Sequence, residues 1–169
     1  MMRKKWIYFL IVLQVLALAG IAASHYLTLK IGEQVVLKTE PIDPRDLFYG
    51  DYVTLNYEIS TLSQNLLGDE DIEQRETVYV VLQKAGDVHE AKSVHRNKPE
   101  VTNDEIVLKG KVRWIDEYSN ILTVDYGIER FYVEEGTGKT IEDERADKVV
   151  VRIAPWGNVV IEELLSNDG

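Results

Sequence analysis

Residues 41–57 (PIDPRDLFYGDYVTLNY) concentrate the side chains that are best suited to chemistry in this chain. Asp43, Asp46 and Asp51 are three carboxylates in a short stretch, and Arg45 stands between the first two. Carboxylates of this kind bind cationic groups, hard metal ions or the basic loops of a partner protein, and arginine pairs with them in a planar, bidentate geometry. One hypothesis is therefore a polar binding cluster.

The same residues also have a purely structural interpretation. Pro44 fixes its own φ and pushes Asp43 into an extended conformation, so residues 43–46 favour a turn in which Asp43 accepts from backbone amides. Gly50 then lets the chain bend into the strand that follows. In this interpretation the segment is a stiff double turn that sets the register of the strand. The sequence leaves both interpretations open.

The part of the chain that contains this cluster follows an apolar segment near the amino terminus. A basic tip (RKK, residues 3–5) precedes an apolar run from Trp6 to about Ala23. At about 1.5 Å per residue, such a run is long enough to cross the ~30 Å hydrocarbon core of a bilayer, and basic residues before it favour a cytoplasmic amino terminus. We expect residues 1–29 to form the basic tip and a transmembrane anchor, and residues 30–169 to form an extracytoplasmic domain.

A cleaved signal peptide is the alternative explanation for the apolar run. The basic tip fits this alternative, and the pairs Ala17/Ala19 and Gly20/Ala22 supply small residues for a cleavage site. The run is long for the apolar part of a signal peptide, which favours the retained anchor. Both explanations place the residues after about 30 outside the cytoplasm.

The exported part is acidic and contains no cysteine. After Leu29 the chain holds 29 acidic and 16 basic residues, a net charge of −13. Such a surface repels phosphate backbones, so we expect no nucleic-acid partner. The lack of cysteine excludes disulfides and thiolate chemistry, and about 140 residues suffice for one domain held together by packing. We expect neither a cofactor nor a bound metal ion.

Short strands dominate the expected structure of the exported part. In residues 51–60, alternation assigns Val53, Leu55, Tyr57 and Ile59 to the core. We expect a polar loop or short helix at 61–76 and one short helix at 139–146. Further strands are expected at 33–39, 77–84, 88–96, 105–116, 120–126, 128–134, 148–154 and 158–164. The fold class is therefore mainly β, an antiparallel barrel or sandwich with one short helix.

Isolated glycine, aromatic and histidine residues receive structural interpretations. Gly110 is a candidate for a β-bulge, and Trp114, Trp156 and Tyr132 are more typical of a core than of a ligand groove. His89 and His95 are six residues apart on one strand, hence about 20 Å from each other, too far to share a metal ion. We expect structural or solvent-exposed roles for both histidines.

Two segments resemble one known family. Residues 50–57 (GDYVTLNY) resemble the signature of the bacterial, membrane-anchored GDYXXLXY family, and residues 130–142 (RFYVEEGTGKTIE) are similar to a strand–glycine–helix segment of that family. The Gly138-Lys139-Thr140 triplet within the second segment lacks the longer glycine spacing of a phosphate-binding loop, so we expect no nucleotide site there.

The resemblance also implies a class of function. Members of that family resemble products found beside, or joined to, polytopic membrane proteins, which implies a binding or accessory module that engages an integral membrane protein. The alternative is a carboxylate-based extracytoplasmic hydrolase or a ligand-binding protein, and an enzyme is the less favoured of these classes. The candidate binding residues are Asp43, Arg45, Asp46, Gly50, Asp51, Tyr52, Gly138 and Glu142.

Overall fold

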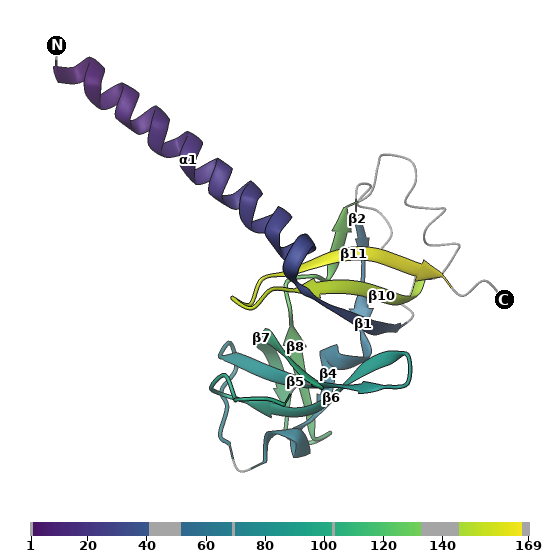
Figure 1. Ribbon diagram of the computed structural model, residues 1–169. Coiled ribbons are helices and arrows are strands. Elements are labelled where there is room, and N and C mark those ends of the chain that lie inside the picture. Colours follow the sequence, from purple (N-terminus) through teal and green to yellow (C-terminus); the bar gives the residue numbers. More distant parts are fainter. Residues whose placement is uncertain (1, 41–51, 69, 103, 133–145, 167–169) are drawn as a thin grey trace.

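The computed structural model describes residues 2–40, 52–68, 70–102, 104–132 and 146–166. One long helix at the amino terminus, α1 (Met2–Ile31), leads into a mainly β domain (Figure 1). Within the described residues the strands are β1 (Glu33–Glu40), β2 (Tyr52–Thr54), β3 (Asn56–Tyr57), β4 (Thr61–Ser63), β5 (Thr77–Ala85), β6 (Val88–His95), β7 (Glu105–Asp116), β8 (Ile121–Asp125), β9 (Arg130–Tyr132), β10 (Ala146–Ile153) and β11 (Val159–Ser166).

The antiparallel strands form a nearly closed barrel. One sheet has the order β11-β10-β1-β3 and a second has the order β4-β8-β7-β5-β6, while β2 pairs with β9. A short 3₁₀ turn, η2 (Glu58–Ser60), joins β3 to β4 and so connects the two larger sheets. At the other side β6 lies against β1, where the Val36 N–H donates to His89 Nδ1 over 3.2 Å. The expected mainly β, antiparallel architecture is confirmed.

The prediction of one continuous strand over residues 51–60 is wrong. Residues 52–54 pair with β9, residues 56–57 pair with β1, and residues 58–60 form η2. Leu55 lies between these strands, and its N–H donates to Glu129 O over 2.8 Å. Each piece therefore has a different partner, because the chain passes from one sheet to the other within ten residues. The core face is as expected at Leu55, Tyr57 and Ile59, which are buried, while the side chain of Val53 lies outside the described part of the chain.

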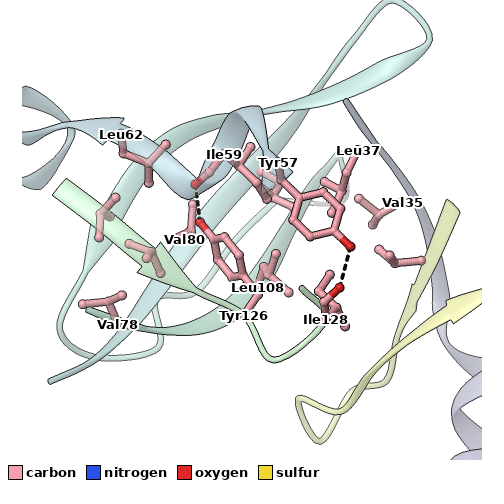
Figure 2. Close-up of a cluster of buried hydrophobic side chains, with 14 of the residues drawn as sticks. Val35, Leu37, Tyr57, Ile59, Leu62, Val78, Val80, Leu108, Tyr126 and Ile128 are labelled. Carbon is pink, nitrogen blue, oxygen red and sulfur yellow. Dashed lines mark hydrogen bonds between the residues drawn. The ribbon is translucent and has the colours of Figure 1, made fainter. Parts of the chain in front are cut away.

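Two tyrosines are buried in the core with their hydroxyl groups satisfied (Figure 2). Tyr57 Oη donates to Ile128 O over 2.7 Å, and Tyr126 Oη donates to Ile59 O over 2.6 Å. Burial raises the pKa of both hydroxyls, with the Glu129 charge as a smaller cause. Each ring thus supplies a large apolar surface. The Tyr57 hydroxyl ties β3 to the connection between β8 and β9, and the Tyr126 hydroxyl ties that connection to η2.

Gly110 does not mark a bulge, contrary to expectation. It pairs in register with Val78, and the irregularity in β7 lies between Val112 and Trp114. A Cβ at Gly110 would lie 2.4 Å from Val124 Cγ1 and 3.0 Å from the Tyr126 ring. The glycine is therefore required by close packing of the neighbouring strand β8.

The remaining expectations differ mainly at the ends of elements. The polar stretch 61–76 contains the short strand β4 and a 3₁₀ turn, η3 (Gln64–Leu67). The strand expected at 128–134 is described only as β9, and the helix expected at 139–146 lies outside the described residues except for Ala146, which begins β10. Trp114 and Trp156 are not core residues, because 58% and 49% of their surfaces are exposed.

Candidate functional site

The predicted binding cluster falls almost entirely outside the described residues. Only Tyr52 is within them, as the first residue of β2 and the register partner of Tyr132. The residues outside are Asp43, Arg45, Asp46, Gly50, Asp51, Gly138 and Glu142. The binding role of these residues therefore stays a prediction.

The described strands do bring the flanks of the two family-like segments together. The first segment, residues 50–57, contains β2 and β3, and the second, residues 130–142, begins with β9. Since β2 pairs with β9, the two segments are neighbours in space, and the strands β1 and β10 that flank them also pair. Residues some 80 positions apart in the sequence are joined in this way through the Tyr52–Tyr132 pair.

The second half of the family signature is structural. Leu55 and Tyr57 are buried in the core, and Tyr57 bonds to the carbonyl of Ile128. Asn56, between them, points to the other side, where its Nδ2 donates to Glu40 Oε2 over 2.8 Å. The alternation of the signature therefore places Leu55 and Tyr57 in the core, while Asn56 between them binds the last residue of β1.

The end of α1 is packed onto the domain through a single-residue connection. Gly32 N donates to Thr28 O over 2.9 Å, and a Cβ at Gly32 would lie 2.4 Å from the same oxygen. Arg152 Nη1 donates to Gly32 O over 3.2 Å, while the Arg152 guanidinium forms two bonds of 2.7 and 3.1 Å with Glu162. The helix is thereby fixed to β10 and β11.

The turn between β10 and β11 lies beside the same end of the helix. Asn158 Nδ2 donates to Ser24 Oγ over 2.8 Å, and the turn is closed by a bond of 2.8 Å from Gly157 N to Ala154 O. Trp156 is at the tip of this turn, with about half of its surface exposed. An exposed tryptophan is thus held close to Ser24, near the carboxyl end of the apolar helix.

A second polar arrangement, on β6, was not predicted from the sequence. Ser93 Oγ lies 2.9 Å from His95 Nε2, and His95 Nδ1 lies 3.0 Å from Glu70 Oε1. The other Glu70 oxygen accepts from Arg96 N over 2.6 Å. This backbone bond, together with the bond to His95, holds the pKa of the Glu70 carboxyl below its usual range. The three side chains form a continuous hydrogen-bonded row, which we call the Ser93–His95–Glu70 row.

The sequence contains a pattern that could have indicated two members of this row, Ser93 and His95. Residues i and i+2 of a strand project from the same face, so the pattern Ser93-x-His95 places both side chains together. A register shift between Val81 and Leu82 leaves Lys92 without a partner residue on β5, which makes a bulge directly before Ser93. Glu70 comes from the segment after η3 and could not be assigned to the row without the fold.

Glu70 also lines an open hollow of about 440 Å³ on the five-stranded sheet. The hollow has acidic walls with an aromatic residue and several apolar side chains; its lining includes Asp71, Ile72, Asp116, Glu117 and Tyr118. In Figure 1 this sheet lies on the side of the domain away from α1. Among the described residues, no three His, Asp or Glu side chains come close enough to hold a metal ion.

These features define a class: a barrel-like, mainly β domain carried by one amino-terminal helix that is long and apolar enough to cross a membrane, or to be a signal sequence. The chain belongs to the GDYXXLXY family, since the family described as "GDYXXLXY protein" matches residues 14–164. Comparison with curated proteins and with solved structures finds no match to the chain.

Proposed function

We propose that this protein is a membrane-anchored, extracytoplasmic binding module that engages an integral membrane protein. The observation that carries the proposal is the rigid connection between α1 and the sheet. Gly32 is the single residue between helix and strand, and Arg152 bonds directly to it. A domain joined to its anchor in this way has a restricted orientation, so that the same surface always faces the membrane and its proteins.

The charge distribution supports an amino terminus in the cytoplasm. Residues 3–5 are basic, and Lys5–Ile31 is the candidate span. About 20 residues cross the hydrocarbon core, so a span that begins near Lys5 ends near Ser24. The Trp156 turn, bonded to Ser24 through Asn158, would then lie at the outer interface, where tryptophan is enriched in membrane proteins.

Photo-crosslinking in intact cells tests this proposal. A photoreactive phenylalanine analogue replaces Trp156 in the full-length chain, and a matched protein carries it in place of Tyr118. Tyr118 is fully exposed but belongs to the turn between β7 and β8, in the sheet away from α1. We expect a stoichiometric crosslink from position 156 to one polytopic membrane protein, and none from position 118.

A substitution in the predicted cluster separates binding from folding. We expect Asp51→Asn to reduce capture of the crosslinked partner while the melting temperature stays nearly unchanged. If Asp51→Asn unfolds the domain, residues 43–51 serve as scaffold and the candidate binding residues are wrong.

The crosslinking experiment has its own contrary outcome. Crosslinks to lipid alone from position 156, or equal crosslinks from positions 156 and 118, would reject engagement of a membrane protein through this surface.

A further inference from the structure

We propose that the Ser93–His95–Glu70 row is a serine-hydrolase centre that cleaves carboxylic esters. The row lies in the five-stranded sheet, apart from the membrane-facing turn of the proposed function, and it involves none of the candidate carboxylates of residues 41–57. The proposal is therefore independent of partner binding. It rests on the mutual geometry of three side chains.

The distances match the roles of nucleophile, base and positioning residue. A serine within hydrogen-bond reach of a histidine, which is itself oriented by a third group, is the arrangement that activates a hydroxyl for attack. Here the two distances are 2.9 and 3.0 Å. Because the Glu70 carboxylate only accepts, Nδ1 of His95 carries the proton, and Nε2 accepts from the Ser93 hydroxyl.

Glu70 is in turn held in position. Its second oxygen accepts from the N–H of Arg96, one residue beyond the end of β6. The Lys92 and Arg96 side chains form ion pairs with Glu105 and Glu76, and the Arg96 charge also acts on Glu70. The negative charge of Glu70 lies beside His95, where it stabilises the imidazolium that forms during the reaction.

The bulge at Lys92 explains how a strand presents this arrangement. Val94, between Ser93 and His95, is fully buried, while Ser93 and His95 are partly exposed on the outer face. Bulges redirect side chains and occur often beside active sites. The inner residue anchors β6 in the core, and the outer pair stays accessible to a ligand.

The reaction uses water as its only co-reactant. Ser93 Oγ attacks the ester carbonyl carbon while its proton passes to His95 Nε2. The bond between that carbon and the alcohol oxygen breaks, and the alcohol leaves with the proton from His95. Water then attacks the acyl-Ser93 ester, giving up one proton to His95, which returns it to Ser93 Oγ as the carboxylic acid departs.

The surrounding charge selects the kind of ester. Glu70, Asp71, Asp116 and Glu117 line the hollow beside Glu70, at the end of the row away from Ser93. Carboxylates repel an anionic substrate and favour a neutral or cationic one. We expect esters with a neutral or cationic alcohol group to be cleaved faster than anionic esters of the same acyl chain.

A fluorophosphonate that carries a reporter tests the centre directly on the full-length protein in mild detergent. We expect one adduct per chain, mapped to Ser93 by mass spectrometry. Ser119, an exposed serine in the β7–β8 turn whose N–H donates to Asp116, serves as the internal comparison. His95→Gln should slow the reaction of Ser93 by about 100-fold or more, the effect of losing a general base.

The role of Glu70 as a positioning residue needs its own readout. Glu70→Gln should slow labelling of Ser93, and Glu70→Asp should restore part of the rate, whereas both variants should melt within a few degrees of the wild type. Hydrolysis of 4-nitrophenyl acetate should disappear in Ser93→Ala and persist in Ser119→Ala.

The proposal is overturned if wild-type Ser93 reacts no faster than Ser119, or if His95→Gln leaves the labelling rate unchanged. The first of these measurements needs no variant, so it decides even if a substitution prevents folding. If the row only ties the segment after η3 to β6, His95→Gln should lower the melting temperature, and Ser93 of the wild type should react no faster than Ser119.

Discussion

The hydroxyl groups of Tyr57 and Ser93 both belong to strands of the barrel, but their surroundings differ. Tyr57 is fully buried, and its hydroxyl bonds to one backbone carbonyl. Ser93 is partly exposed, and its hydroxyl is the first member of a row that ends at an ionised carboxylate. A buried hydroxyl with a fixed backbone acceptor contributes to stability, whereas an accessible hydroxyl beside a histidine can transfer a proton.

The difference separates the family signature from the chemistry of the domain. Leu55 and Tyr57, at the end of the signature, are core residues, so this half of the motif is explained by packing. The Ser93–His95–Glu70 row lies outside the signature, on the outer face of β6. A motif that defines a family can therefore describe its core, while reactive side chains lie elsewhere.

The largest expected effect is at Tyr57. Tyr57→Ala should lower the free energy of unfolding by about 3–5 kcal/mol, because it removes a buried ring. Tyr57→Phe keeps the ring and leaves the Ile128 carbonyl without its donor, at a cost of about 1–2 kcal/mol. Urea unfolding of the two variants measures the difference, with Tyr118→Phe as an exposed control. Equal stability of Tyr57→Ala and wild type would contradict a core role.

Gly110 provides a smaller effect in the same core. Gly110→Ala should cost about 1–3 kcal/mol, because the added methyl group overlaps Val124 Cγ1. Val124→Ala in the same chain opens space for that methyl group, so the two substitutions should be less destabilising together than the sum of their separate effects. Additive costs in a double-mutant cycle would show that the close contact is not the cause.

The smallest effect is at Glu70, which is partly exposed. Glu70→Gln should lower the free energy of unfolding by less than about 1 kcal/mol at neutral pH, because solvent screens such pairs. Since the folded protein lowers the pKa of Glu70, its stabilising contribution is present above the unfolded pKa, about 4.3, and is lost as the pH falls through the lowered value. Unfolding at pH 7 and pH 3 should show the difference between variant and wild type shrinking in acid. A difference as large at pH 3 as at pH 7 would contradict this assignment.

The strand content and the core side of the signature could be predicted from local pattern. Alternation placed Leu55, Tyr57 and Ile59 inside, and all three are buried. The same pattern predicted one continuous strand, because alternation does not report which neighbour each residue pairs with. The exposure of Trp156 was missed for a similar reason: average aromatic burial says nothing about a turn held beside a helix.

Only part of the candidate site could be predicted from local pattern. The Ser93-x-His95 spacing was visible in the chain, but Glu70 is 25 residues from His95 and joins it only through the fold. The residues predicted as a binding cluster, from Asp43 to Asp51, lie outside the described part of the chain, so their role depends on the proposed capture experiment.

The sequence by itself determined the apolar helix, the mainly β class and the inward face of residues 55–59. Each depends on the composition or periodicity of neighbouring residues, which the chain carries locally. Only the tertiary structure decided that β2 pairs with β9, that the Trp156 turn lies beside Ser24, and that Glu70 meets His95. These contacts join distant residues, and their geometry arises from how the strands close around one core.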